Sequence, residues 1–470
     1  MKDHRIIPTS LFVGAALLLM ACLPSGPQGA GAIPAHEAGS HNIKFSEQIL
    51  PLLQQKFAPL LQNETGLRLD SWESLIAGSD FGEVLIAFDA DNSLLIELAT
   101  KLDAAHPLRP HADALTSEEI DLVRRWIDEG ARNDDGEVPY AEAEHLLYAC
   151  NQGTAVVSVI DMEANVVIRT VKLQPLGFTE NSRPHHTAVE PDGSFWYVSL
   201  IGDDKVLKFN RNNDLVAQAD FERPGLLALH PTEDILFVGR SMKAVKPPQR
   251  IGMIQRSDMT IEEIDVFFPR PHALAIHPDG KHIYTASLAE NRMATVDFAE
   301  ERAELLSIEG PTHTFVQFAI APDGQTMVVG GQLTGAFLFF DTSTPSAPTL
   351  VETIHINAAP WHPVFSPDGR FVYLGNKMAN TVTVVDVENR SVAAVIKGNG
   401  LSQPHGSAIS PDGRFVYIAS NNLSGGYTPR YNFGDNAKAG TVTVINTETR
   451  TIEKVLEVGP NATGLSTATR

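Results

Sequence analysis

Residues 367–396 read PDGRFVYLGNKMANTVTVVDVENRSVAAVI. A Pro-Asp-Gly turn is followed by an apolar strand, a polar turn and two further strands rich in β-branched residues. The same kind of turn recurs at residues 191, 231, 278, 322, 367 and 411, with spacings of 40 to 47 residues. Repeats of this length that consist of short strands are typical of radially arranged β-sheets. The sequence therefore predicts a mainly β chain with a β-propeller over residues 135–470.

Seven strands occupy the position after the repeated turn, which predicts seven blades. Their central residues are Leu147, Trp196, Leu236, Ile283, Met327, Val372 and Val416. The first blade lacks its innermost strand, while residues 464–469 remain over at the C-terminus. We expect that segment to complete the first blade, because closure removes the open sheet edges. The blades resemble the YVTN family of surface and periplasmic propellers, most clearly at residues 373–376 (YLGN) and 417–421 (YIASN).

The composition excludes several classes of function. The chain has 470 residues, 36 Lys and Arg against 57 Asp and Glu, a net charge of −21 and two cysteines. An acidic chain is poorly suited to bind nucleic acid, since phosphates are neutralised by basic side chains. Two cysteines are too few for a zinc ribbon, an iron–sulfur cluster or a disulfide framework. We therefore expect no nucleic-acid partner.

The N-terminus has the features of an export signal. Lys2 and Arg5 precede an apolar run over residues 11–20, which is too short for an ordinary membrane span. Residues 19–22 (LMAC) resemble the bacterial lipoprotein signal, in which the cysteine becomes acylated. We predict a signal peptide over 1–22, lipidation of Cys22 and a flexible linker over 23–42. The protein would then lie on the periplasmic side of the outer membrane or on the cell surface, held by its lipid anchor alone. Cleavage near residues 30–32 is the alternative and would leave a soluble periplasmic protein.

Residues 43–134 are predicted to form a small all-α domain. Apolar residues at helical spacing occupy 49–61, and the segments 70–73 and 116–119 match the capping box that begins many helices. Three segments, 66–71, 90–95 and 115–131, resemble the planctomycete-type cytochrome c domain.

This resemblance places a Cys-x-x-Cys-His haem motif after Lys56. The sequence has FAPLL at residues 57–61 instead, so both thioether cysteines and the iron-binding histidine are missing. We therefore predict a degenerate, cytochrome c-like domain without covalent haem c. Non-covalent haem on His106 or His111 is the alternative, although such histidines are usually solvated.

Histidines recur just before the innermost strands. Five of the seven blades have a histidine at or near a proline there, and pseudo-symmetry would direct these side chains toward one axis. These histidines are His185, His186, His272, His313, His362 and His405. Converging imidazoles bind copper, zinc, nickel or iron. The ring is similar to the copper centre of nitrous oxide reductases, and selenium-binding-protein-type methanethiol oxidases show a related arrangement. This resemblance implies that the six histidines are candidate ligands of copper or another transition metal.

Other interpretations of the same residues remain open. Pro-His-Gly is common in the propeller family that this chain resembles, where the ring can bond the backbone. The histidines can instead form a polar funnel for a small ligand, joined by three arginines that precede the prolines: Arg183, Arg223 and Arg270. We expect structural roles for His230, His277, His282 and His355, and an inert thiol at Cys150. The insertions 425–440, with Tyr427, Tyr431 and Phe433, and 243–250 are candidates to cover the channel mouth.

These observations support three hypotheses. The first is an exported, lipid-anchored propeller with a transition-metal site at the channel mouth, acting as a metal-dependent oxidoreductase with a periplasmic electron-transfer or surface protein as partner. The second is a non-enzymatic binding or scaffold propeller that uses the haem-less helical domain for docking. The third is a lactonase-like hydrolase, because related propellers hydrolyse lactones in their channel.

Overall fold

The computed structural model describes residues 43–61, 66–79, 82–100, 115–242, 249–356, 358–429 and 438–468. The chain divides into two compact units, Met1–Asn42 and Ile43–Arg470, and all described residues belong to the second. Several predictions concern residues outside the described ranges. These are the signal peptide with Cys22, the linker, His106 and His111, residues 243–248, and Tyr431 with Phe433.

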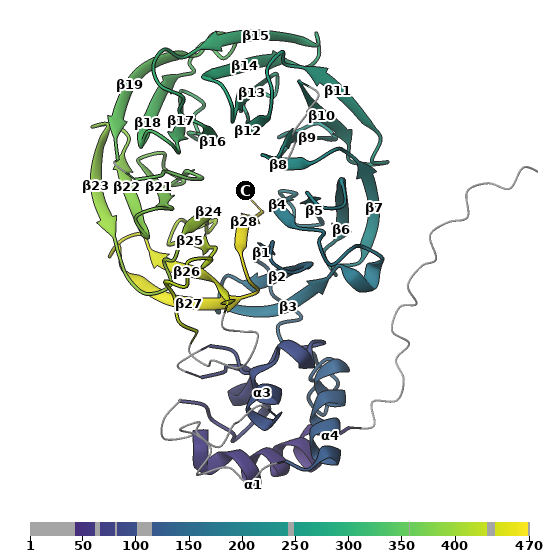
Figure 1. The fold of residues 1–470 in the computed structure, drawn as a ribbon. Helices are drawn as coiled ribbons and strands as arrows, with labels where there is room; N and C mark the ends of the chain where they lie inside the picture. Colours follow the sequence, from purple (N-terminus) through teal and green to yellow (C-terminus); the bar gives the residue numbers. More distant parts are fainter. Residues whose placement is uncertain are drawn as a thin grey trace, which may run out of the picture. The chain divides into compact units, whose positions relative to one another are not determined.

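The described part of the chain contains seven four-stranded antiparallel sheets, which surround a common centre as the blades of a propeller (Figure 1). This confirms the predicted mainly β fold with seven blades. Blades are numbered here in chain order, and strands are given from the centre outward.

The strands of blades 1 to 4 are β28 (Ala462–Thr467), β1 (Leu146–Asn151), β2 (Val156–Asp161) and β3 (Val166–Lys172); β4 (Pro184–Val189), β5 (Phe195–Leu200), β6 (Lys205–Asn210) and β7 (Leu215–Asp220); β8 (Pro224–Leu229), β9 (Ile235–Arg240), β10 (Arg250–Gln255) and β11 (Ile261–Asp265); β12 (Pro271–Ile276), β13 (His282–Ser287), β14 (Arg292–Asp297) and β15 (Arg302–Ser307). Those of blades 5 to 7 are β16 (Phe315–Ile320), β17 (Thr326–Gly331), β18 (Ala336–Asp341) and β19 (Thr349–His355); β20 (Val364–Phe365), β21 (Phe371–Asn376), β22 (Thr381–Asp386) and β23 (Ser391–Ile396); β24 (Pro404–Ile409), β25 (Phe415–Ser420), β26 (Gly440–Asn446) and β27 (Ile452–Val458).

The core lies between neighbouring blades. The second and third strands of the blades are largely buried, because each sheet has the preceding blade on one face and the following blade on the other. Tyr373 and Val384 of blade 6, for example, pack in one cluster with Val416 and Ile418 of blade 7. Two buried faces explain why these strands read as nearly continuous apolar runs in the sequence.

The C-terminal strand closes the ring. β28 pairs with β1 in antiparallel register, with Leu147 opposite Thr467 and Ala149 opposite Leu465, and the two strands lie side by side in Figure 1. This confirms the predicted closure, although the strand begins at Ala462 rather than at residue 464. The last blade also contacts the first through the Tyr417 hydroxyl, which donates to Asn165 Oδ1 at 2.6 Å.

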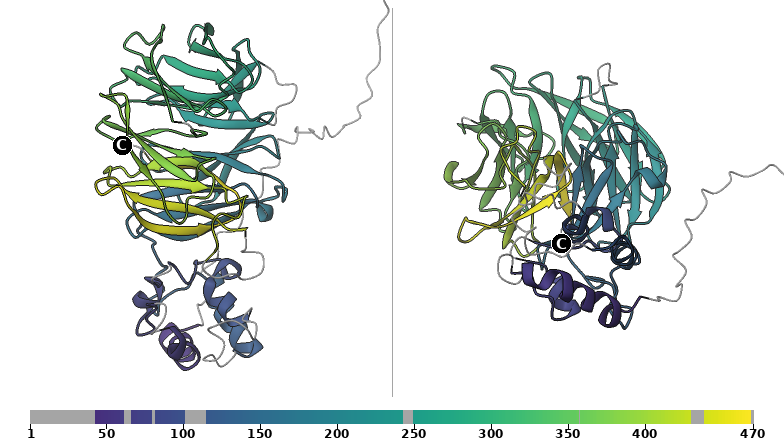
Figure 2. Two further views of the ribbon diagram at one scale, coloured as in Figure 1. Left: turned by 60° about the vertical axis from the view of Figure 1, so that its left-hand side comes forward. Right: turned by 60° about the horizontal axis from the view of Figure 1, so that its bottom comes forward.

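The two faces of the propeller carry different connections. In blade 2, Pro184 at the start of the innermost strand lies opposite Leu200 at the end of the second strand. The same antiparallel pairing in blades 3 and 7 brings the starts of innermost strands and the ends of second strands to one face, which we call the histidine face. The Pro-Asp-Gly turns join first to second strands and therefore lie on the opposite face, called the turn face. The two side views in Figure 2 show the strands running between these faces.

The helical region precedes the propeller in the chain. Its elements are the π-helical turn η1 (Phe45–Ile49), α1 (Leu50–Leu61), α2 (Trp72–Ile76), the 3-10 turn η2 (Ala90–Asn92), α3 (Leu94–Thr100) and α4 (Ser117–Asp128). The Thr116–Glu119 capping box of α4 is present as predicted. The box predicted at residues 70–73 is wrong by one position. Ser71 caps α2, and the Ser74 hydroxyl accepts from the Ser71 amide at 2.9 Å. Within the described residues, no helix is both long and apolar enough to cross a membrane.

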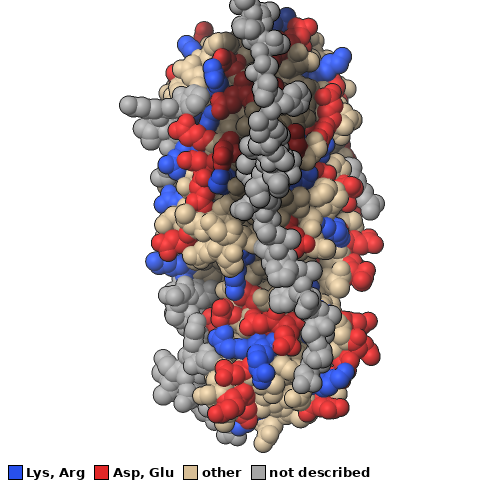
Figure 3. Space-filling view, turned by 90° about the vertical axis from the view of Figure 1, so that its right-hand side faces the viewer, with Lys and Arg blue, Asp and Glu red and all other residues tan. Residues whose placement is uncertain are grey.

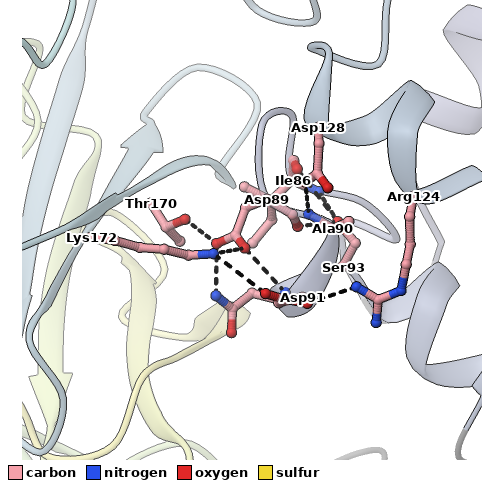
Figure 4. Close-up of polar contacts among 10 residues, drawn as sticks. Ile86, Asp89, Ala90, Asp91, Ser93, Arg124, Asp128, Thr170 and Lys172 are labelled. Atoms are coloured by element: carbon pink, nitrogen blue, oxygen red, sulfur yellow. Dashed lines mark hydrogen bonds and ion pairs between the residues drawn. The ribbon is translucent and has the colours of Figure 1, made fainter. Parts of the chain in front are cut away.

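A buried carboxylate joins the helical region to blade 1 (Figure 4). The Asp89 side chain is only 1% exposed and pairs with Lys172 Nζ at 2.7 Å. It also accepts from the Thr170 hydroxyl and from the Asn92 side-chain amide. Lys172 and Thr170 both belong to β3, so one carboxylate holds the outermost strand of blade 1 against the loop before η2.

Replacing this carboxylate is expected to weaken the whole protein. Asp89→Ala leaves a lysine and a hydroxyl without their acceptor, which should lower the free energy of unfolding by about 3 kcal/mol. Urea unfolding at pH 7 measures the effect. Asp91→Ala is the matched control, since its 2.7 Å ion pair with Arg124 lies on the surface and should contribute less than about 1 kcal/mol. Equal losses in the two variants would contradict the proposed role of Asp89.

Candidate metal centre

The candidate histidines enter the centre of the propeller from four blades. His185 and His186 are on β4, His272 is on β12 and His405 is on β24. His362 lies two residues before β20. All five side chains are buried.

The backbone before the innermost strands repeats one strained conformation. Among the described residues, the residue that directly precedes the strand has a φ of 49° to 58° in six blades. These residues are Arg183, Arg223, Arg270, Thr314, Gln403 and Asn461. A positive φ is uncommon outside glycine and often marks functional sites. Here hydrogen bonds hold it, since the Arg223 carbonyl accepts from the Ser241 amide at 2.8 Å and the Arg183 carbonyl from the Ile201 amide at 3.3 Å.

Five imidazoles form one continuous cluster. The ring centres of His362 and His405 are 4.9 Å apart, and those of His405 and His185 are 5.8 Å apart. His272 extends the cluster from His185 at 5.8 Å, and His186 extends it from His362 at 6.1 Å. We call these five residues the histidine cluster.

The cluster is uncharged at neutral pH. Burial lowers the pKa of His186 to about 3 and that of His272 to about 4. Burial, reinforced by the neighbouring imidazoles and Lys377, holds the pKa values of His185, His362 and His405 well below the usual range. Neutral imidazole is the form that binds transition metals or accepts a proton.

Hydrogen bonds fix the protonated nitrogen in three rings. His272 Nδ1–H donates to the Arg240 carbonyl at 2.7 Å, which leaves Nε2 with its lone pair, as in most metal-bound histidines. His186 Nδ1 accepts from the Leu227 amide at 3.3 Å. His185 Nδ1 lies 3.1 Å from the side-chain amide of Gln152, so a metal on His185 Nε2 would require this amide to rotate and accept the Nδ1 proton.

Three ring nitrogens of the cluster have no protein partner. His185 Nε2, His362 Nε2 and His405 Nδ1 are all buried without a hydrogen bond to another described residue. Because buried polar atoms are nearly always satisfied, these three nitrogens on adjacent rings are the available donors of the cluster. The chemistry of the donors therefore fits a transition-metal ion.

The spacing of the rings allows two neighbouring imidazoles to share a metal ion. Two imidazoles that share an ion at about 2.0 Å have ring centres roughly 4.5 to 6.4 Å apart, and the four spacings above fall within this range. In the described parts of the chain, however, no three His, Cys, Asp or Glu side chains are placed so that they could hold one ion together. A site with three ligands would therefore require side-chain rotation.

His313, the sixth predicted ligand, lies outside the cluster. It precedes β16 by two residues, just as His362 precedes β20, so its position in the chain does not set it apart. Its Nδ1 is 2.7 Å from the Thr334 hydroxyl, and its ring packs against Phe315. Thr334 and Phe315 therefore hold the His313 ring outside the histidine cluster.

Two residues beside the cluster were missed by sequence reasoning. The Trp361 ring centre is 4.2 Å from that of His405, and Lys377 Nζ lies 4.0 Å from the Trp361 ring centre. Burial lowers the pKa of Lys377 to about 8. Lys377 follows a second strand rather than preceding an innermost one, so the repeated Pro-His pattern gave no signal for it.

Glycine replaces histidine in blade 3 for a steric reason. A Cβ on Gly225 would lie 2.8 Å from the Arg240 backbone and 3.0 Å from His272 Nδ1. The missing side chain therefore leaves room for the hydrogen bond that orients His272.

The remaining candidates have structural surroundings. Arg223 donates to the Ile201 carbonyl at 2.9 Å and pairs with Asp204, while the predicted funnel role of Arg183, Arg223 and Arg270 stays a prediction. His230 and His277 bond the backbone of the turns, as predicted. Cys150 is a buried free thiol whose pKa is raised by burial, which agrees with the predicted inert role. Tyr427 is buried and its hydroxyl donates to Glu457 at 2.7 Å.

Acidic and basic side chains are interspersed over the described residues of the side drawn in Figure 3. Among the described residues, the histidine cluster is the strongest candidate site.

Fold and cluster together define a seven-bladed propeller with a histidine-lined centre. A family model described as "Lactonase, 7-bladed beta-propeller" matches residues 130–348. No curated protein matches the chain.

Three solved structures with the same fold illustrate the range of relatives. The periplasmic gluconolactonase of Pseudomonas aeruginosa is 17% identical, with 69% of this chain and 98% of that chain covered and a TM-score of 0.54. A protein of Lactobacillus plantarum is 14% identical, with coverages of 69% and 99% and a TM-score of 0.53. A chain of Kuenenia stuttgartiensis hydrazine synthase is 18% identical, with coverages of 64% and 92% and a TM-score of 0.52. At these identities the likeness establishes the propeller fold alone.

Proposed function

We propose that the histidine cluster binds a transition-metal ion, with copper as the first candidate. The observation that carries this proposal is the set of three partnerless ring nitrogens on adjacent, buried and uncharged imidazoles. Copper and zinc both favour neutral imidazole, and the two compete through geometry and supply rather than through donor chemistry.

The roles of the residues follow from their positions. His405 and His362, the closest pair, would supply the first two donors, with His185 as the third. The Arg240 carbonyl orients His272, and Gln152 would set the tautomer of His185. Bound copper would supply one-electron redox chemistry. Lys377 and Trp361 lie against the pair and would limit the access of water to it.

The proposal extends to the cellular setting of the protein. An export signal with an acylated Cys22 would place the propeller outside the cytoplasm, where a copper site can exchange electrons with a periplasmic or surface protein. The helical region, which resembles a cytochrome c domain without its haem motif and is joined to blade 1 through Asp89, would then serve as a docking module.

Metal loading tests the proposal directly. Protein freed of metal by chelation and dialysed against Cu(I), Cu(II) or Zn(II) is expected to retain about one equivalent of copper, measured by elemental analysis with an optical spectrum. His405→Leu should weaken binding at least roughly 100-fold, because it removes a ligand from the closest pair. His313→Gln is the matched control and should bind as the wild type does. Failure of the wild type to retain any metal would end the proposal.

A lactonase-like hydrolase is the second candidate, favoured by the family model that matches residues 130–348. A neutral imidazole in the channel, such as His272 with its free Nε2, would act as general base on a water that attacks the lactone carbonyl. Hydrolysis of glucono-δ-lactone by metal-free protein, lost in His272→Gln, would favour this function. If the protein neither binds a metal nor hydrolyses the lactone, the non-enzymatic binding or scaffold hypothesis is the one that remains.

A further inference from the structure

Five large exposed apolar side chains lie in loops of the histidine face. In the described parts of the propeller, the large exposed apolar residues lie either on outermost strands or in loops of the histidine face. The loop residues are Met242, Phe267, Leu333, Met378 and Leu423. Leu333, Met378 and Leu423 occupy corresponding loops of blades 5, 6 and 7 and are 68%, 80% and 67% exposed. Exposed apolar residues concentrated on one face often mark an interaction surface.

Charge divides the same face into two sectors. The described loops within and between blades 5, 6 and 7 on this face contain three basic side chains, Lys377, Lys397 and Lys438, and no carboxylate. We call them the basic sector. The described loops from the connection between blades 1 and 2 as far as blade 4 form the acidic sector. They contain Arg183, Arg223 and Arg270 against five carboxylates: Glu180, Asp203, Asp204, Glu222 and Glu290. Glu309 lies in the connection between blades 4 and 5, on the boundary of the two sectors. The corresponding loops of blade 1, residues 152–155 and 459–461, are uncharged.

This division makes the face complementary to itself. A two-fold axis that lies in the plane of the face and passes through blade 1 places blade 2 of one copy on blade 7 of the other, blade 3 on blade 6 and blade 4 on blade 5. Each acidic sector then meets a basic sector, as a two-fold interface requires. We propose that the chain forms a homodimer through its histidine face, with the two channel mouths facing each other.

The arrangement pairs specific loops. Lys397, between blades 6 and 7, meets Glu222, between blades 2 and 3, and Lys438 meets Asp203. Met378 of blade 6 meets Met242 of blade 3, so apolar tips lie among the charge pairs. The net charge of −21 on each copy opposes association at long range, but such repulsion is screened beyond about 8 Å at physiological salt. Whether two copies associate therefore depends on the charge pairs and apolar contacts within the interface.

A second copy fits this face better than a membrane does. An anionic bilayer laid across the face would meet the lysines of one sector but also the carboxylates of the other. A second copy meets both sectors with opposite charge. It would also cover the channel mouth and keep bulk solvent from the histidine cluster of each copy.

Sedimentation equilibrium tests the dimer. The mature chain carries Cys22→Ser, so that no acyl chain can cause association, and is expected to dimerise at about 50 µM in 0.15 M salt. Met378→Ser with Leu423→Ser should weaken association at least tenfold, as should Lys397→Glu. Adding Glu222→Lys to Lys397→Glu should restore it. Lys281→Glu, an exposed change on the turn face, is the control and should have no effect.

Cross-linking gives a second measurement. Lys397→Cys combined with Glu222→Cys should yield a covalent dimer with a short bismaleimide, while Lys281→Cys should not. A wild-type chain that remains monomeric at about 100 µM would overturn the proposal, as would a dimer that is insensitive to all variants of the histidine face. Binding to vesicles that contain phosphatidylglycerol, lost in Met378→Ser with Leu423→Ser and without any dimer, would also overturn it and assign the surface to a membrane.

Discussion

A chain that ends at Gly459 is expected to lose the folded propeller. The truncation removes β28 and with it the pairing of Ala149 with Leu465 and of Leu147 with Thr467. It also exposes the inner edge of β1 and uncovers a cluster shared by blades 1 and 7, which contains Ala462 and Leu465. Together these losses exceed about 5 kcal/mol, comparable to the whole stability of many domains.

Circular dichroism and size-exclusion chromatography would show the effect as lost cooperative unfolding and as aggregation through the free edge. A chain that ends at Ala468 keeps the whole strand and is the control, with an unchanged melting temperature expected. Adding a peptide of residues 460–470 to the truncated chain should partly restore cooperative unfolding. A truncated chain that remains monomeric with the wild-type melting temperature would show that closure contributes little.

Metal-free protein is expected to lose stability steeply as the pH falls below about 6.5. The unfolded chain protonates its histidines near that pH, but the folded cluster does not, because the pKa values of His186 and His272 are about 3 and 4 and the other three are also well below the usual range. The unfolded state therefore binds more protons, and stability present above pH 6.5 is lost on acidification. Each histidine contributes about 1.4 kcal/mol per pH unit, so five contribute several kcal/mol.

Urea unfolding between pH 7.5 and 5 measures this slope, and potentiometric titration counts the protons taken up on unfolding. His405→Gln should lower the slope by about one proton. The exposed His355→Gln is the control and should leave the slope unchanged. A stability that stays flat between pH 7 and 5 would show that the buried histidines titrate normally.

The fold was predictable from the sequence because the same turn recurs from one blade to the next. Gly369 has a φ of 71°, a conformation that glycine adopts without strain, and the same turn marks most of the blades. The closing strand was predictable because the first blade lacks an innermost strand and a strand-like segment remains over at the C-terminus. The α2 cap was placed one residue early because serine at position 74, rather than Glu73, completes the box.

The site was predictable only in part. Five histidines lie together because their positions relative to the innermost strands are nearly equivalent, so pseudo-symmetry was a valid guide. The same argument failed for His313, whose ring lies against the Thr334 hydroxyl and Phe315 instead. The placement of Lys377 and Trp361 beside the cluster depends on loop geometry and ring stacking, which the repeat pattern does not encode.

The shared first blade also sets the order of folding. β1 and β28 pair although residues 147 and 467 stand at opposite ends of the propeller sequence. Closing a loop of this length carries an entropic penalty of roughly 5 kcal/mol unless the intervening blades have already formed. The ring would therefore close last, after blades 2 to 7 have formed, and an open propeller with exposed strand edges would precede the native state.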